Sequence, residues 1–167
     1  MAEEKIVSEI ECRSGILDMG SWVGKELIEI PDHIVNSWQK VVDTMAEILD
    51  VPAALIMKND PPFIEVCCSS ESIKNPYKAG DSEHLAGRYC EEVIKRKNKL
   101  LVANALKDKK WNKSPDIKLG MISYLGFPIL WPDGEVFGTI CILDSKENRY
   151  DKRYEGLMSR FRELVAG

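Results

Sequence analysis

The side chains in this sequence with the greatest capacity for covalent chemistry are its five cysteine thiols. The number is odd, two of the cysteines are adjacent, and no two are spaced as Cys-x-x-Cys. This pattern disfavours a disulfide framework and a structural zinc site, because both need paired thiols. We therefore expect free thiols in a reducing compartment, at Cys12, Cys67, Cys68, Cys90 and Cys141.

Cys90 falls in a stretch with helical spacing, and two interpretations are open for its thiol. A buried thiol packs as a small hydrophobic side chain. A reactive thiol needs a neighbouring cation or base that lowers its pKa. Arg88 is the nearest cation, but residues two apart on a helix point to different sides, so packing is the favoured interpretation.

A metal or haem site would need imidazole ligands, and the chain has only two histidines. His33 lies at the start of a predicted helix and His84 precedes another, so surface or capping roles are favoured for both. The sequence shows no Ser-His-Asp set, phosphate loop, paired-acid motif or metal-ligand cluster. We predict no catalytic residue, no metal site and no enzyme activity, and the sequence identifies no cofactor.

Length and composition indicate one globular domain. The chain has 167 residues, 44% of them hydrophobic and 30% charged, which suits a single core with a solvated surface. No apolar run approaches the roughly 20 residues of a membrane span, and the acidic N-terminus lacks the apolar region of a secretory signal. The net charge is −4 and basic residues are scattered, which disfavours nucleic acid as a partner. A cytoplasmic location is expected.

Apolar residues recur with helical spacing at both ends of the domain, which predicts a first and a last helix. Pro31 and Asp32 suit a helix start, and Pro52 disfavours helical geometry before it, so the first helix should end near Asp50. Residues 1–30 are predicted to be an N-terminal extension with room for one helix, and residues 31–167 the domain. The last helix carries an apolar stripe of Tyr154, Leu157, Met158, Phe161, Leu164 and Val165.

Apolar runs between these two helices predict five strands. Pro132-Asp133-Gly134 suits a type I turn followed by a left-handed glycine, which closes a hairpin. A loop is expected over residues 69–83, a helix around Cys90, and an irregular segment with a helical turn at each end over residues 104–120. Strands joined by tight turns are antiparallel and terminal helices can cover one sheet face, so the predicted class is α+β. The predicted strands are 53–57, 63–68, 100–102, 122–131 and 136–143.

The hairpin sequence resembles that of the GAF domain family. Its "Y-x-G-x-P-I … G-x-x-x-G-T-I-C-x-L-D" pattern is similar to residues 126–129, Gly134 and residues 138–144 here. Tyr89-Cys90-Glu91 and residues 101–105 resemble the family's helix and third strand, so the resemblance covers residues 32–166. It implies a central antiparallel sheet of about six strands. N- and C-terminal helices would cover one face, and a ligand-pocket helix and loop region would cover the other.

The resemblance also implies a pocket wall. The helix with Cys90 borders the family's pocket, and residues 104–120 cover it. On that basis we predict ligand-binding residues at Cys90, Trp111, Met121 and Tyr124, for a small molecule that the sequence does not identify. Gly126 and Gly138 indicate bulges or a close approach of the backbone to a helix or a ligand. The alternative that the large side chains only fill the core stays open.

The function implied by the resemblance is regulatory, as in a domain of a prokaryotic sensor histidine kinase or a related signalling protein. The domain would bind a small molecule or sense redox state, and its terminal helices would pass the signal to an attached output domain. Two alternatives stay open: a structural dimerisation module without ligand, and a thiol-dependent reductase of the free methionine sulfoxide type. The apolar stripes of the terminal helices predict a homodimer, which polar residues at Val42 and Met45 should break, unless they unfold the chain.

Overall fold

The computed structural model describes residues 30–166, and within them six strands form one antiparallel sheet. The strand order is β3-β2-β1-β6-β5-β4. The predicted α+β class with a six-stranded sheet is therefore confirmed, whereas the prediction for residues 1–30 lies largely outside the described residues. The strands are β1 (Ala53–Asp60), β2 (Phe63–Ser69), β3 (Ser82–His84), β4 (Leu100–Val102), β5 (Ser123–Leu130) and β6 (Val136–Asp144).

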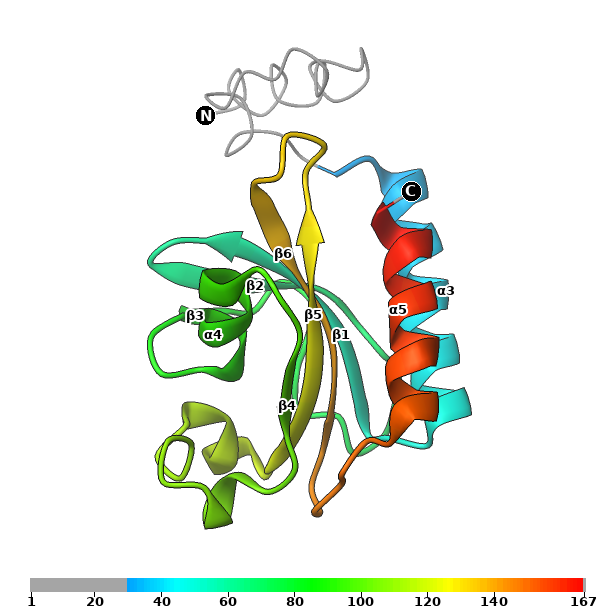
Figure 1. Cartoon of the computed structure of the whole chain (residues 1–167). Helices are drawn as coiled ribbons and strands as arrows, with labels where there is room; N and C mark the ends of the chain where they lie inside the picture. The colour runs from blue at the N-terminus through cyan, green and yellow to red at the C-terminus, as the bar shows by residue number, and fades with distance from the viewer. Residues whose placement is uncertain (1–29, 167) are drawn as a thin grey trace. The chain divides into compact units, whose positions relative to one another are not determined.

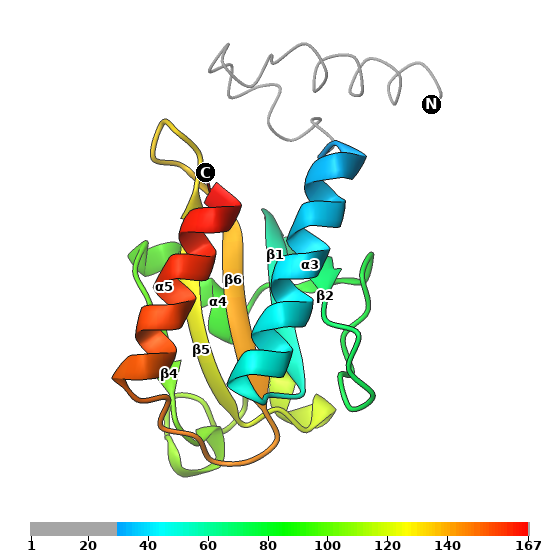
Figure 2. The same cartoon turned by 90° about the vertical axis from the view of Figure 1, so that its right-hand side faces the viewer.

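Helices cover both faces of the sheet. On one face lie α5 (Lys152–Ala166) and, from Trp38 onward, α3 (Asp32–Leu49), as Figures 1 and 2 show. The other face is covered by α4 (Tyr89–Arg96) and by the segment that includes the short 3-10 helices η2 (Ala105–Lys107) and η3 (Pro115–Leu119). These two turns stand at the two ends of the predicted irregular segment. None of the helices in the described part of the chain is long and apolar enough to cross a membrane.

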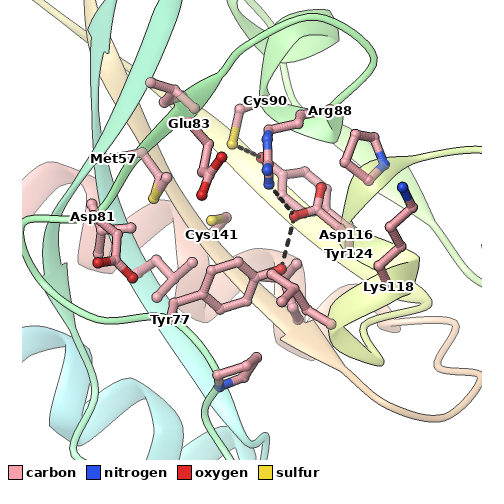
Figure 3. Close-up of a pocket in the computed structure, with 17 residues that line it drawn as sticks. Met57, Tyr77, Asp81, Glu83, Arg88, Cys90, Asp116, Lys118, Tyr124 and Cys141 are labelled. Carbon is pink, nitrogen blue, oxygen red and sulfur yellow. Dashed lines mark hydrogen bonds and ion pairs between the residues drawn. The ribbon is translucent and has the colours of Figure 1, made fainter.

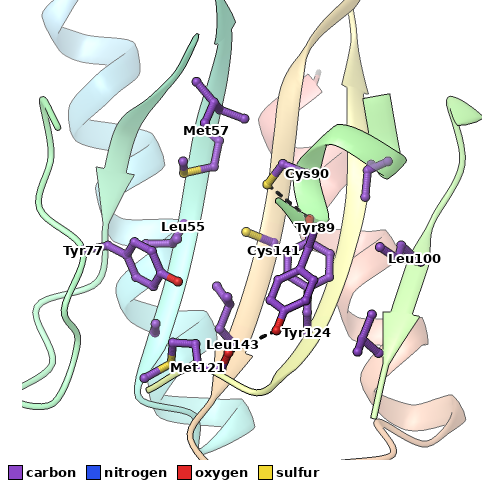
Figure 4. Packing of buried hydrophobic residues seen from close by; sticks show 14 of the residues in the cluster. Leu55, Met57, Tyr77, Tyr89, Cys90, Leu100, Met121, Tyr124, Cys141 and Leu143 are labelled. Carbon is purple, nitrogen blue, oxygen red and sulfur yellow. Dashed lines mark hydrogen bonds between the residues drawn. The ribbon is translucent and has the colours of Figure 1, made fainter. Parts of the chain in front are cut away.

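The alternation of side chains along each strand divides the core into two halves. Cys141 and Leu143 of β6 belong to the hydrophobic cluster on the α4 side, which Figure 4 shows. Ile140 and Ile142 point to the opposite side and are fully buried there. The residues of α3 and α5 buried in the helical layer are Trp38, Val42, Met45, Ala46, Leu49, Met158 and Val165. Val42 and Met45 are 0% exposed within one chain, so polar residues there would act on folding.

The end of α3 and the turn between β5 and β6 lie where the sequence predicts them. Asp50 adopts a positive φ of 53° and terminates α3 before Pro52. In the β5–β6 hairpin, the Gly134 amide donates to the Trp131 carbonyl at 2.9 Å, and Gly134 has φ 90°. This is the left-handed glycine that the sequence of the turn predicts.

Two elements differ from the prediction. Residues 69–83 do not form a loop throughout, because β3 pairs with β2 through Ile64 opposite Glu83 and Glu65 opposite Ser82. The helix around Cys90 begins only at Tyr89, because Gly87 has φ 81° and the extended Arg88 backbone precedes the first turn. Leu85, which has the spacing of a helical residue, therefore lies before the helix.

Gly138 is required by strand packing. A Cβ atom at this position would overlap the carbonyl oxygen of Met57 on the neighbouring strand β1. The close approach predicted from the sequence is thus to the chain's own backbone, which cannot move away without breaking the sheet.

We expect Gly138→Ala to destabilise the protein by about 2 kcal/mol or more, because the added methyl group overpacks a rigid backbone. Gly156 in α5 is the matched control, since a Cβ there meets no atom within 4 Å. Gly156→Ala should stabilise the protein by about 0.5–1 kcal/mol through helix propensity. Urea unfolding of the two variants measures both changes, and equal effects of the two would contradict this interpretation.

Candidate functional site

A cavity of 370 Å³ lies on the α4 side of the sheet, as Figure 3 shows. Its wall on strands β1 and β2 is apolar and consists of Leu55, Met57, Ile64 and Val66. Charged side chains from other segments also line it, namely Asp81, Glu83, Arg88, Asp116 and Lys118. An apolar cavity of this size with a few polar groups is the usual form of a small-molecule site.

A buried polar cluster centred on Asp116 covers part of this cavity. The Arg88 guanidinium forms an ion pair with Asp116 at 3.0 Å, and the Tyr77 hydroxyl donates to the same oxygen, Oδ1, at 2.8 Å. The Arg88 Nε donates to the His84 carbonyl at 2.9 Å. The cluster joins three segments distant in sequence: the chain before β3, the start of α4, and η3.

Burial dominates the acid–base properties of this cluster. Burial raises the pKa of Asp116, and the guanidinium of Arg88 and the hydroxyl of Tyr77 oppose that rise. Burial also raises the pKa of Tyr77, and the neighbouring Asp116 carboxylate raises it further. A buried carboxylate of this kind depends on its cation and its donors to remain ionised at neutral pH.

The sulfur of Cys90 faces two hydroxyl groups, those of Thr139 and Tyr124. It lies 3.3 Å from the Thr139 hydroxyl and 3.4 Å from the Tyr124 hydroxyl. Hydrogen bonding by the Cys141 thiol, with contributions from Thr139 and Tyr124, lowers the pKa of Cys90. Burial raises the pKa of Cys141, so this thiol keeps its proton more readily than Cys90 does.

Of the four predicted ligand-binding residues, Cys90 and Tyr124 line the cavity and Trp111 and Met121 do not. The latter two are buried in the hydrophobic cluster beside it, where Tyr89 connects them. The Tyr89 ring packs between those of Trp111 and Tyr124, at 5.3 and 4.9 Å, and its hydroxyl donates to the Met121 carbonyl. Trp111 and Met121 therefore fill the core, which is the alternative that the sequence leaves open for the large side chains.

Gly126 places the Tyr124 hydroxyl beside Cys90. The two residues lie on the same face of β5, and a Cβ atom at Gly126 would overlap the Tyr124 ring. The ring can therefore lie along the strand and extend its hydroxyl to the thiol. The close approach predicted at Gly126 is to this ring.

All three residues of the Asp116 cluster are absent from the sequence prediction: Tyr77, Arg88 and Asp116. The prediction that Arg88 points away from Cys90 is wrong, because Arg88 precedes α4 in an extended conformation and lines the same cavity. A signal for Asp116 was present in Ser114-Pro115-Asp116, since the Ser114 side chain caps η3 and Pro115 begins it. Tyr77 lies in a polar stretch, and nothing local distinguishes it.

Neither histidine lies in the cavity wall. The His84 ring is exposed in β3 and packs on Phe63 at 4.9 Å between ring centroids. Among residues 30–166, no group of three or more His, Cys, Asp or Glu side chains is placed to hold a metal ion.

Comparison with solved structures identifies the same fold in several proteins. The GAF domain of a phosphoenolpyruvate-protein phosphotransferase from Acinetobacter has a TM-score of 0.65 and 18% identity, over 80% of each chain. A type II free methionine-R-sulfoxide reductase from Thermoplasma acidophilum has a TM-score of 0.63 and 13% identity, over 81% of this chain and 91% of that one. The phycoerythrobilin-bound GAF domain of a cyanobacterial phytochrome has a TM-score of 0.67 and 11% identity, over 80% and 83%.

These identities are low, so the three structures show a shared fold only. No curated protein matches the sequence. The sequence profile of the GAF domain, however, matches residues 34–167, which is most of the chain. With that match, the six-stranded sheet and the flanking helices, the chain belongs to the GAF domain family, a family of sensory and regulatory domains.

Proposed function

We propose that this chain is a cytoplasmic sensory domain that binds a small molecule in the cavity between the sheet, α4 and η3. The cavity carries the proposal: its 370 Å³ and apolar strand wall suit the body of a compact organic molecule. The charged side chains around it suit a polar end group. The fold alone does not define the chemical class of this ligand.

The Asp116 cluster supports a role for η3 as a cover of the cavity. The contacts of Arg88 and Tyr77 with Asp116 are polar, and they hold segments with few apolar anchors in the hydrophobic cluster. Segments held in this way open locally at lower free energy than a packed core. A ligand can therefore enter by displacing a few polar contacts while the sheet stays intact.

Strand β6 supplies the physical route from the cavity to the terminal helices. Cys141 and Leu143 line the cavity, and the alternating residues Ile140 and Ile142 are buried on the face that α3 and α5 cover. A shift of this strand acts on both faces at once because the core is close-packed. The proposed output is a change in the geometry of the two helices, read by an attached domain such as a histidine kinase.

The structural dimerisation module remains the second candidate, and exposed apolar side chains on the terminal helices favour it. Ile48 of α3 is 58% exposed and Leu164 of α5 is 68% exposed. A homodimer that buries these positions is compatible with ligand sensing, because signals in such modules pass along the helices. The thiol-dependent reductase is less favoured, because the charged and apolar lining of the cavity is explained by ligand binding alone.

The cavity assignment predicts that filling the cavity abolishes ligand binding. Val66→Phe adds a ring to the apolar wall, whereas Leu130→Phe adds the same ring at the half-exposed end of β5, away from the cavity. A library of small metabolites should contain compounds that raise the melting temperature of the native chain and of Leu130→Phe but not of Val66→Phe. Stabilisation of Val66→Phe by the same compounds would place the binding site elsewhere.

The Asp116 cluster predicts a pH-dependent loss of stability in Arg88→Met. Removing the guanidinium raises the pKa of the buried carboxyl further. A carboxyl with a raised pKa contributes most when protonated, and this contribution is lost as pH rises through its folded-state pKa. The variant should lose about 3 kcal/mol at pH 7.5 and clearly less at pH 4.5, by urea unfolding. Arg88→Met/Asp116→Asn should remove this pH dependence, and an equal loss at both pH values would contradict the assignment.

The proposed homodimer predicts that a charge at the exposed apolar positions dissociates it. Ile48→Glu and Leu164→Glu should shift sedimentation from dimer to monomer and leave the unfolding free energy of the monomer within about 0.5 kcal/mol, because both side chains are exposed. Leu106→Glu is the matched control, since Leu106 is 57% exposed on the opposite side of the sheet. A native chain that sediments as a monomer at high concentration would rule out this dimer.

A further inference from the structure

Two thiols from different elements meet at the wall of the cavity. Cys90 comes from α4 and Cys141 from β6, and both line the cavity. Figures 3 and 4, from different directions, show the two sulfur atoms side by side. The fold brings them together although 51 residues separate them in sequence (141 − 90).

The surroundings give the two thiols different roles. The Cys90 sulfur lies 3.3 Å from the Thr139 hydroxyl and 3.4 Å from the Tyr124 hydroxyl, and its interactions with Cys141 and these two hydroxyls lower its pKa. A lowered pKa favours the thiolate, which is the nucleophilic form of cysteine. Cys141 is held as the thiol by burial and can supply a proton. A nucleophile and a protonated thiol in contact are the two components that disulfide formation requires.

The cavity gives a small oxidant access to this pair. Cys90 is 7% exposed and Cys141 is 0% exposed, so neither is reached from the outer surface. Both nevertheless line a cavity with room for a molecule much larger than hydrogen peroxide. The pair is thereby protected from bulky reagents and open to small ones.

We propose that Cys90 and Cys141 form an intramolecular disulfide when the domain meets hydrogen peroxide. The Cys90 thiolate attacks one peroxide oxygen, the O–O bond breaks, and the leaving hydroxide takes a proton to become water. Cys90 is then a sulfenic acid. The Cys141 sulfur attacks the Cys90 sulfur, the S–O bond breaks, and the departing hydroxide leaves as water with the proton of Cys141.

The balance of this reaction is two thiols oxidised to one disulfide and one peroxide reduced to two waters. A dithiol reductant reverses it by thiol–disulfide exchange. The reaction goes beyond the proposed function, because it needs the cavity as an entry path but no bound ligand. The bond would tie α4 to β6 at the strand that separates the cavity from the helical layer.

The adjacent pair Cys67 and Cys68 provides an internal comparison. Cys67 is the more exposed thiol and its pKa is also lowered, by a hydrogen bond with Cys68. A bond between two adjacent residues, however, needs a special backbone geometry, so it would distort β2. Oxidation governed by exposure would modify Cys67 first, whereas the geometry assigns the disulfide to Cys90 and Cys141.

Peptide mapping of the whole chain tests the proposal. The reduced protein is exposed to a small excess of hydrogen peroxide, remaining thiols are alkylated, and the digest is analysed without reduction. The expected result is a linked peptide pair containing Cys90 and Cys141, together with a loss of two hydrogen atoms from the intact mass. The link should persist in Cys12→Ser/Cys67→Ser/Cys68→Ala, which retains only this pair of thiols.

Two further variants separate the roles. In Cys141→Ser, Cys90 should stop at the sulfenic acid and be trapped by dimedone, whereas in Cys90→Ser no linked peptide and no adduct at Cys141 should form. A linkage confined to Cys12, Cys67 or Cys68 would overturn the proposal, as would a Cys90 that stays fully alkylatable after peroxide. The library screen uses reduced protein, so a failure of ligand binding and a failure of disulfide formation are observed separately.

Discussion

The antiparallel pairing of β6 with both β1 and β5 is the constraint on which the rest of this structure depends. The strand is buried along nearly its whole length, and its successive side chains enter two different cores. A slip of one residue would place Ile140 or Ile142 in the cavity and Cys141 beneath the helices, so the register is strongly specified. Gly138 fixes the start of this pairing, because only a residue without Cβ fits against the Met57 carbonyl.

The cavity side of the sheet combines opposite physical demands. Its apolar wall raises the cost of any charge, yet Asp116 is buried there beside Arg88 and Tyr77. A buried carboxylate is stable only when its cation and its donors are all in place. The cluster therefore has one arrangement of low free energy, and losing any of these contacts raises the free energy. That property gives η3 one defined position over the cavity, in addition to the contact of Ile117 with the hydrophobic cluster.

The elements that could be predicted from sequence are those governed by local chemistry. The β5–β6 hairpin follows from Gly134 and the alternation on either side of it, and the end of α3 follows from Pro52. The strand β3 could not be predicted, because Ser82-Glu83-His84 is polar and exposed throughout and pairs only because β2 offers an edge.

The candidate site was predicted in part for the same reason. Cys90 and Tyr124 lie on regular elements that the resemblance to the family places at the pocket, and both line the cavity. Trp111 and Met121 lie in irregular backbone, where the size of a side chain does not show its direction. The contacts of Asp116 span 39 residues to Tyr77 and 28 to Arg88, and no local pattern encodes a pairing over that distance.

The two outermost strands of the sheet, β3 and β4, have only three residues each. A long, flat sheet edge offers a row of unpaired amides and carbonyls on which a second chain can add a strand and begin to aggregate. Here each outermost strand is short, and β3 carries a glutamate and a histidine. Many copies of this domain can therefore stand close together, as on ribosomes translating one message, with little risk that β3 or β4 will recruit a further strand.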